Sequence, residues 1–198
     1  FNHATIEQMR EWTGYLGMEI YNGVICFLDG SPYATNKWDI LLSEKRRIWG
    51  FANDDAHAER HVELGWNVAY VTDRSRAGVV DALRQGRFYG STGVVISSIE
   101  VDGMTIRLET DNARRICAIR DIGTRVAMVN DRMIEVTVPD TATYLRFECW
   151  GDGEQFAWTQ PFFVEDVPGE QVTSDVLNDW LVSLRFDHLT LGDAAPAQ

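Results

Sequence analysis

The period of the hydrophobic pattern changes near Gly93, and this change limits the possible folds more than any other feature of the sequence. Before Gly93, segments with apolar residues at helical spacing alternate with short β-rich runs. After it, the helical spacing disappears, and β-branched runs are separated by DG, DN and GDG turns. We therefore expect βα units first and an antiparallel all-β segment afterwards.

The same pattern bounds the individual elements. Helices are expected at 5–15, 34–43 and 75–85, and strands at 18–24, 47–52 and 66–71. Thr5 and Gln8 have the spacing of a capping box, and Gly86 ends the third helix. The later strands are expected in the runs VVISSIEV, MTIRLET, ICAIRDI, MIEVTV, YLRFECW and FAWTQPFFV. Pro161 interrupts the last run and is expected at an edge or a bulge, because proline cannot donate a ladder hydrogen bond.

Three regions follow from this order of elements. Residues 1–95 are expected to form a parallel sheet or barrel wall, and residues 96–166 a small antiparallel β-sandwich. Residues 167–198 are expected to form a closing helix, with Ser174 or Asp175 as its N-cap, and a mobile tail. The apolar face of that helix contains Val176, Leu177, Trp180, Leu181 and Leu184.

The charge of the chain argues against two classes of partner. It has 18 basic and 30 acidic residues, a net charge of -12, so its average field repels nucleic acid and anionic membrane surfaces. No apolar run reaches the ~18 residues of a membrane-spanning helix. Cys26, Cys117 and Cys149 lack metal-site or redox spacing and are expected as buried free thiols in a reducing, cytoplasmic compartment.

The segment RIWGFANDDAH, residues 47–57, places polar groups at the end of an apolar strand. If the strand geometry persists, Asp55 and His57 point to the same side while Asp54 faces away. A carboxylate and an imidazole together suit zinc, iron or manganese. A structural interpretation has equal weight, because aspartates at strand ends often cap a helix or close a turn.

Several segments together resemble the latter part of PHP-domain metal-dependent phosphoesterases. They are GMEIYNG at 17–23, the segment 37–57 that ends in DDAH, GWNVAYV at 65–71 and ALRQGRFYGSTGVVISSIEV at 82–101. The strands that end in YLRFECWGDGEQFAWTQPFFV resemble the β-rich C-terminal extension of carbaryl-hydrolase-like members. The resemblance implies a partial, distorted βα barrel of the α/β class. It also implies clustered divalent ions and hydrolysis of a small phosphoester or ester, with Asp55 and His57 matching the family's last metal-ligand motif.

The sequence departs from that family's pattern in its first half. The opening HxH motif, an intermediate acidic ligand and an HP-type histidine are absent, and the chain starts at Phe1. We therefore expect a fragment or split half, whose divalent metal is weakly bound or absent unless an N-terminal partner chain completes the site. The alternative is a non-catalytic remnant that forms a homo-oligomer or binds a partner, because an open barrel leaves sheet edges exposed.

Other side chains are candidates for a supporting role. Asp54 is expected to orient His57 or to bind metal through water. Its alternative role is to cap the helix or turn that follows the strand. Asn22 is expected to contact substrate, or else to form a turn with the glycine that follows. Three residues of GRFYGSTG have groups that bind phosphate, although helix-end and strand-start roles explain them nearly as well: Arg87, Ser91 and Thr92.

Two further histidines are weaker metal-ligand candidates. His3 lies near the position of the absent HP histidine, but a histidine near a terminus is more often exposed. His61 follows His57 by four residues, which on a helix places both rings on one face, but a solvated polar face is the preferred interpretation. A third hypothesis is a sugar-binding platform formed by aromatic residues around the GDGEQ turn, although aromatic residues in strands usually belong to the core: Trp150, Phe156 and Trp158.

Overall fold

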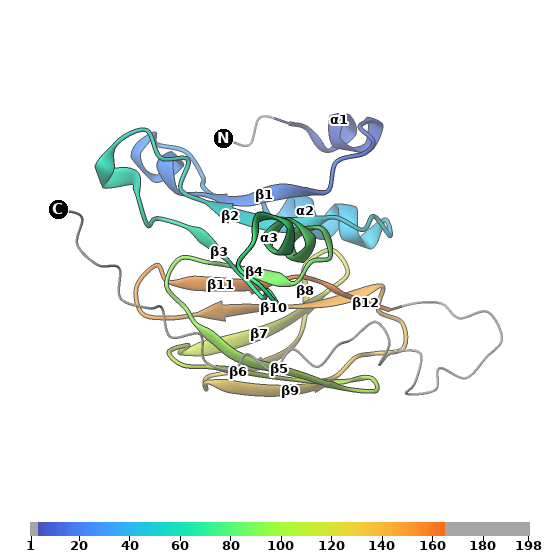
Figure 1. The fold of residues 1–198 in the computed structure, drawn as a ribbon. Helices are drawn as coiled ribbons and strands as arrows, with labels where there is room; N and C mark the ends of the chain where they lie inside the picture. The colour runs from blue at the N-terminus through green and yellow to red at the C-terminus, as the bar shows by residue number, and fades with distance from the viewer. Residues whose placement is uncertain (1–3, 165–198) are drawn as a thin grey trace.

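A computed structural model describes residues 4–164, and in this part of the chain β-strands dominate (Figure 1). Twelve strands form three sheets, accompanied by three α-helices and two short 3-10 helices. In chain order the elements are α1 (Ile6–Glu11), β1 (Gly17–Asn22), η1 (Gly23–Phe27), α2 (Thr35–Ser43), β2 (Trp49–Asn53), η2 (Glu59–His61), β3 (Trp66–Ala69), α3 (Arg76–Arg84), β4 (Phe88–Ser91), β5 (Ile96–Asp102), β6 (Thr105–Thr110), β7 (Arg115–Arg120), β8 (Thr124–Val129), β9 (Met133–Thr137), β10 (Tyr144–Trp150), β11 (Phe156–Thr159) and β12 (Phe162–Phe163).

The predicted α/β fold, a partial distorted βα barrel resembling a TIM-like barrel, is wrong. A barrel wall requires successive parallel strands side by side. Here β1 and β2 pair in parallel as a two-stranded sheet, whereas β3 pairs antiparallel with β4. The strands β3 and β4 therefore belong to the same sheet as β7, β8, β10 and β11 rather than extending the parallel pair.

The edge of β2 that faces away from β1 is closed by two side-chain amides. The Gly50 N–H donates to Gln160 Oε1 at 2.9 Å, and Gln160 Nε2 donates to the Gly50 carbonyl at 2.8 Å. Asn67 bonds the peptide groups of Ala52 in the same way, at 3.0 and 2.8 Å. Gly50 and Ala52 are two positions apart on the strand, so their peptide groups point to the same edge. Each amide therefore takes the place of a peptide group in a neighbouring strand.

Two antiparallel sheets face each other, and all of their strands except β3 and β4 come from the second part of the described chain, where antiparallel strands are expected. One has the order β3-β4-β11-β10-β7-β8, with β12 on β10, and the other is β5-β6-β9 (Figure 1). The core between them includes Leu108, Ile116, Leu145 and Phe147, all fully buried. Strand β8 was not predicted. Its first three residues are exposed, so the strand lacks the buried apolar alternation on which the prediction relied.

The opposite face of the larger sheet packs against the first part of the chain. Its core includes Ile20, Trp38, Tyr144 and Trp158. Successive side chains of β10 point to opposite faces of the sheet, so Tyr144 lies in one core and Leu145 in the other. The parallel strands β1 and β2 therefore pack against a sheet of the sandwich that is covered on both faces.

The helices begin where their caps predict. Thr5 and Gln8 form the predicted capping box of α1, and Ser75 Oγ accepts the Gly78 N–H at the start of α3. Pro161 lies in the break between β11 and β12. The predicted C-terminal helix and tail lie outside residues 4–164, and none of the helices within this range has the length and apolar character to cross a membrane.

Candidate functional site

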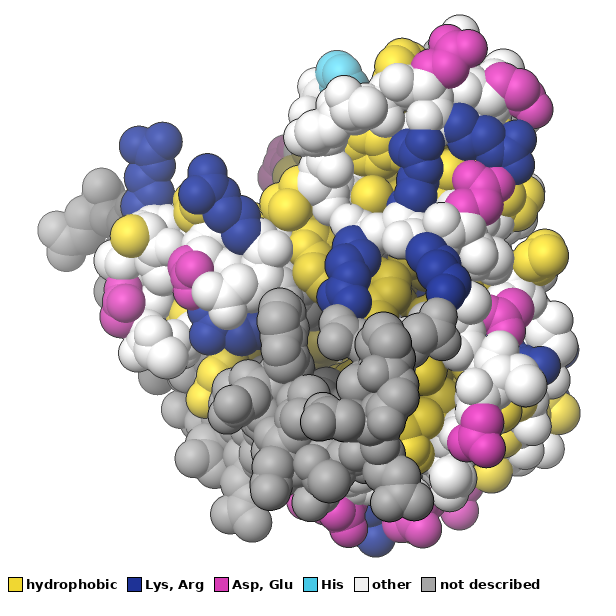
Figure 2. Space-filling model, turned by 90° about the vertical axis from the view of Figure 1, so that its right-hand side faces the viewer, with side chains coloured by type: hydrophobic (Ala, Val, Ile, Leu, Met, Phe, Trp, Pro, Cys, Tyr) yellow, Lys and Arg dark blue, Asp and Glu magenta, His cyan; other side chains and the backbone are white. Residues whose placement is uncertain are grey.

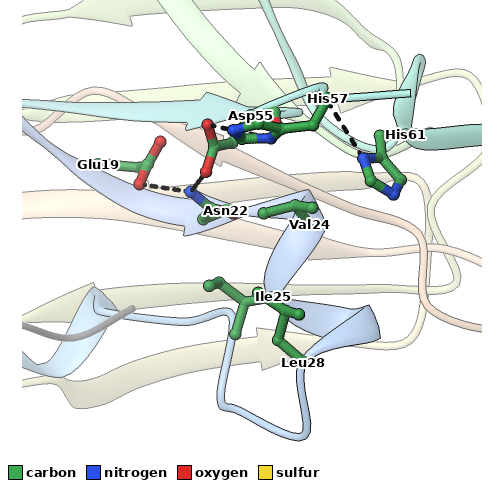
Figure 3. A pocket seen from close by; sticks show the side chains of 8 residues that line it. All are labelled: Glu19, Asn22, Val24, Ile25, Leu28, Asp55, His57 and His61. Atoms are coloured by element: carbon green, nitrogen blue, oxygen red, sulfur yellow. Dashed lines mark hydrogen bonds and ion pairs between the residues drawn. The ribbon is translucent and has the colours of Figure 1, made fainter. Parts of the chain in front are cut away.

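A cavity of about 480 Å³ lies where β1 and β2 end (Figure 3). Asn22 and Asn53 are register partners at the carboxyl ends of these parallel strands, so the segments that follow both strands start at the same edge. The first continues as η1 and the second as the loop that contains Asp55. The cavity is lined by Glu19, Asn22, Val24, Ile25, Leu28, Asp55, His57 and His61.

Asp55 and His57 lie together in this cavity, but not because the strand continues. Strand β2 ends at Asn53, and Asp55 has a left-handed backbone with φ of 54°. The turn brings His57 Nδ1 to 2.6 Å from the Asp55 carbonyl oxygen and to 3.9 Å from its carboxylate Oδ1. Nδ1 is therefore the donor nitrogen, and the other ring nitrogen keeps its lone pair. This is the arrangement in which an imidazole binds a metal ion through Nε2.

Asn22 holds two carboxylates of the cavity at once. Its Nδ2 donates to Glu19 Oε2 at 2.9 Å and to Asp55 Oδ2 at 3.2 Å (Figure 3). Asn53 Nδ2 fixes the other Glu19 oxygen at 2.9 Å. Asn22 was expected to contact a substrate, whereas Glu19 was not predicted as a site residue. The signal was available: a single carboxylate in the otherwise apolar run Met18–Tyr21, on the opposite face from Met18.

Asp54 stabilises the loop instead of facing the cavity. Its carboxylate accepts the N–H groups of Glu63, Leu64 and Gly65 at 3.1, 2.7 and 2.8 Å. Its own carbonyl accepts the Val24 N–H at 3.0 Å. Of the roles predicted for Asp54, the structure therefore shows the capping role, and it fixes the loop that contains His57 and His61 against η1.

His61 is buried in the wall of the cavity. The His57 backbone N–H donates to His61 Nδ1 at 3.2 Å, and the Phe27 ring lies 5.2 Å from the imidazole. The two imidazole rings are 6.4 Å apart, although His57 precedes the three-residue helix η2 that ends at His61. The preferred interpretation of a solvated face is wrong for His61, which is 6% exposed.

The phosphate-binding candidates lie elsewhere. Arg87 pairs with Asp81 next to α3. Ser91 Oγ donates to the Val94 carbonyl at 2.7 Å, and Thr92 Oγ1 donates to the Glu154 carbonyl at 3.0 Å. Ser91 ends β4 and Thr92 follows it, so these contacts have a structural role at the end of a strand and not at its start as predicted. None of the three candidates lines the cavity described above, and His3 lies outside the described residues.

The aromatic residues around the GDGEQ turn are mostly core. Trp158 is 1% exposed and stacks on Phe156 at 5.5 Å between ring centroids. Trp150 is half-buried, with the guanidinium groups of Arg115 and Arg125 at 5.4 and 5.7 Å from its ring. With Trp158 enclosed, these side chains do not form a shared flat face for a sugar.

Two tyrosines outside the cavity lining, Tyr21 on β1 and its bridge partner Tyr33, are poor candidates for a base. Burial raises the pKa of Tyr21 above its ordinary range, with the neighbouring Cys26 thiol adding to the shift. Burial and the Glu154 carboxylate raise the pKa of Tyr33 to about 12. Both phenols therefore remain protonated near neutral pH. The carboxylate of Glu19 is the better placed proton acceptor.

The prediction of a metal-binding group within this chain is wrong for residues 4–164. In that range no three His, Cys, Asp or Glu side chains are grouped so that they could hold an ion. Asp55 and His57 offer two ligands of types that suit zinc, manganese or iron, which fits one corner of such a site. A tightly held catalytic ion needs at least one more protein ligand.

Comparisons with protein-family models, with curated proteins and with solved structures found no match.

Proposed function

We propose that this chain forms one wall of the active site of a metal-dependent phosphoester hydrolase. One observation carries the proposal: His57 Nδ1 is bonded to the Asp55 carbonyl, which leaves Nε2 outside that bond, and the two side chains line the same cavity. The resemblance to PHP-domain phosphoesterases agrees with this reading, because their last ligand motif matches the same two residues. The remaining ligands would come from an N-terminal partner chain.

The chemistry divides between the ion and the side chains. A bound divalent cation supplies positive charge for phosphoryl oxygens and lowers the pKa of water. Asp55 and His57 would hold it, and Asn22 keeps the Asp55 carboxylate in place through its 3.2 Å hydrogen bond. Glu19 lies in the same cavity and takes the proton that an attacking water releases.

The cavity also favours one type of leaving group. Three of its lining residues are apolar and follow β1: Val24, Ile25 and Leu28. Val24 and Ile25 are buried, whereas Leu28 is 51% exposed and accessible to a bound molecule. An aryl or alkyl group covering Leu28 loses water contact, which favours its binding. We therefore expect apolar phosphoesters to be better substrates than highly charged ones.

The test is hydrolysis of p-nitrophenyl phosphate with zinc, manganese or iron. The chain is assayed alone and mixed with a second chain that carries the HxH half of a PHP domain. We expect turnover in the mixture, and a loss of at least about 100-fold in Asp55→Asn and His57→Gln. Asp102→Asn is the matched control and should retain activity, because Asp102 is the exposed last residue of β5 and does not line the cavity. Absence of turnover under every one of these conditions would reject the proposal.

A second candidate function is self-association through β8. This strand ends the larger sheet, and its Val126 and Met128 side chains are exposed, as is Ile122 just before it. Apolar side chains on an edge strand favour pairing with another chain. In this alternative, the chain is a non-catalytic module that forms a homo-oligomer.

A further inference from the structure

Asn67, on β3, connects the protected edge of β2 to the cavity. Its Oδ1 accepts the Ala52 N–H at 3.0 Å, and its Nδ2 donates to the Ala52 carbonyl at 2.8 Å. The amide can make both bonds in one orientation only, because its oxygen cannot donate and its nitrogen cannot accept. Nδ2 also donates to Asn53 Oδ1, at 3.2 Å. The backbone of β2 therefore fixes the Asn67 side chain as a donor toward Asn53.

Asn53 continues this series of hydrogen bonds into the cavity wall. Its Oδ1 accepts from Asn67, and its Nδ2 donates to Glu19 Oε1 at 2.9 Å. Both neighbours require this orientation, because the Asn67 nitrogen offers only hydrogens and an ionised carboxylate offers only acceptors. A reversed amide would place two oxygen atoms together at Glu19 and two NH₂ groups together at Asn67. Asn67 therefore selects the side of the Asn53 amide that Glu19 contacts.

Glu19 is held in the cavity wall by neutral amides. Its second oxygen, Oε2, accepts from Asn22 Nδ2 at 2.9 Å (Figure 3), and its contacts among the described residues include no lysine or arginine. On the face shown in Figure 2, by contrast, lysine or arginine side chains lie beside acidic ones. The two amides orient the carboxylate without placing a cation beside it. Glu19 therefore has a fixed direction and remains able to accept a proton.

We propose that Asn67 is a positioning residue for Glu19 and acts through Asn53. Under the proposed function, on which the role of Glu19 as proton acceptor rests, Asn67 sets the direction in which the carboxylate meets the attacking water. Asn67 itself does not line the cavity. Its effect on the reaction is therefore an effect on the geometry of Glu19, and substrate binding should change little when Asn67 is replaced.

Asn67→Asp tests this inference by reversing the hydrogen bond to Asn53. The new carboxylate can still accept the Ala52 N–H, but it cannot donate, so the Asn53 amide should turn its Nδ2 toward it and its Oδ1 toward Glu19. The full chain is labelled with ¹³C in glutamate carboxyl groups and with ¹⁵N in asparagine side chains, and NMR spectra are recorded at pH 8. Signals are assigned by their loss in Glu19→Gln and Asn53→Ala. We expect the Asn53 amide and the Glu19 carboxyl signals both to shift.

Gln160→Glu is the matched control. It makes the same change in the other amide that protects the edge of β2, but Gln160 bonds Gly50 instead of Asn53. Both variants lose one hydrogen bond to β2, whereas only Asn67→Asp should move the Glu19 signal. In the assay with the second chain, Asn67→Asp should lower kcat about 10-fold with little change in KM, and Gln160→Glu should retain kcat.

Asn53→Ala is a second variant, which leaves the bonds between Asn67 and Ala52 in place and should also shift the Glu19 signal. A Glu19 signal that is unchanged in both Asn67→Asp and Asn53→Ala, or that shifts equally in Gln160→Glu, overturns the inference. A shifted signal with unchanged kcat also overturns it, because the geometry of Glu19 would then not affect the reaction. Absence of hydrolysis in the parent mixture, together with the expected shifts, rejects the proposed function and leaves the positioning of Glu19 by Asn67 standing.

Discussion

The guanidinium of Arg146 is bound to the carboxylate of Asp39 by two hydrogen bonds of 2.7 Å, although the two residues are 107 positions apart in the chain. Both side chains are buried, one on β10 and the other on α2. Burial acts to lower the pKa of Arg146, but the hydrogen bond and the charge of Asp39 raise it above its usual range. The guanidinium therefore stays charged, and its hydrogen bonds to Asp39 join α2 to the sandwich.

We expect Asp39→Asn to lower the free energy of unfolding by about 3–5 kcal/mol, because it removes the carboxylate that bonds the buried Arg146 twice and leaves only Glu148, at 3.6 Å, as a counter-ion. Urea denaturation followed by tryptophan fluorescence measures the effect. Asp152→Asn is the matched control, since the Asp152 pair with Arg114 is exposed, and it should change stability little. Equal effects of the two substitutions would show that the buried pair does not join the two parts of the fold.

Asp54→Ala should lower stability by about 1–3 kcal/mol, because three backbone N–H groups lose their acceptor. Hydrogen exchange should quicken first at Leu64 and Gly65, whose amides donate to this carboxylate. Asp55→Asn serves as the control, since its side chain caps no backbone group among the contacts described for it. Unchanged exchange at Leu64 and Gly65 in Asp54→Ala would refute the capping role.

The three cysteines should differ in reactivity. Cys117 and Cys149 are buried, and burial raises the pKa of both thiols, whereas Cys26 is exposed. Because the thiolate is the reactive form, a disulfide reagent at pH 8 should label about one thiol per native chain and about three in urea. The variant Cys26→Ser should show almost no fast labelling. Rapid labelling of two or more thiols in the native chain would contradict the buried positions.

Stability should decrease at alkaline pH. Burial raises the pKa of Cys149 and of Tyr144, so the folded chain keeps these protons at a pH where the unfolded chain has lost them. Their contribution is fully present below the unfolded pKa values, about 8.5 for cysteine and 10 for tyrosine, and is lost as pH rises above them. The unfolding free energy should fall by up to about 1.4 kcal/mol per pH unit for each proton. Urea titrations from pH 8 to 11 measure how steeply the unfolding free energy falls with pH. In Cys149→Ala this fall should be shallower between pH 9 and 10.

Met128→Lys tests the self-association candidate. Met128 is 49% exposed on the edge strand β8, and a lysine there opposes strand pairing between chains. If β8 mediates a homo-oligomer, light scattering should show the parent chain as a dimer or larger and the variant as a monomer. Lysine in place of Met133, which is exposed on β9, controls for a general effect of charge. A parent chain that remains monomeric at high concentration removes this candidate.

The local elements of the fold were predictable, and the partners of the strands were not. The helices α1, α2 and α3 and the strands β1, β2 and β3 follow from hydrophobic period and caps, which are properties of adjacent residues, whereas β4 was not predicted. Strands β3 and β4 flank α3 as in a βαβ unit, but they pair antiparallel with each other, and β11 pairs with β4. Those pairings depend on contacts between residues far apart in the chain.

Part of the candidate site was predicted, but the geometry that brings its residues together differs from the expected continuation of the strand. Asp55 and His57 lie together as expected, but a left-handed residue at Asp55 brings about the contact, and the sequence does not show that backbone angle. Glu19 was missed because a single glutamate in a strand is usually exposed. His61 was assigned to a polar face because the sequence does not reveal that Phe27, on η1, packs against it.

The amides of Asn67 and Gln160 have a consequence beyond the site, because a strand with free peptide groups can act as a template for amyloid-like growth. By bonding the outer peptide groups of Gly50 and Ala52, the two side chains leave an incoming chain nothing to add to at these positions. Replacing either amide with leucine would leave an N–H and a carbonyl of β2 without a partner, and another chain could then pair with the strand at that position.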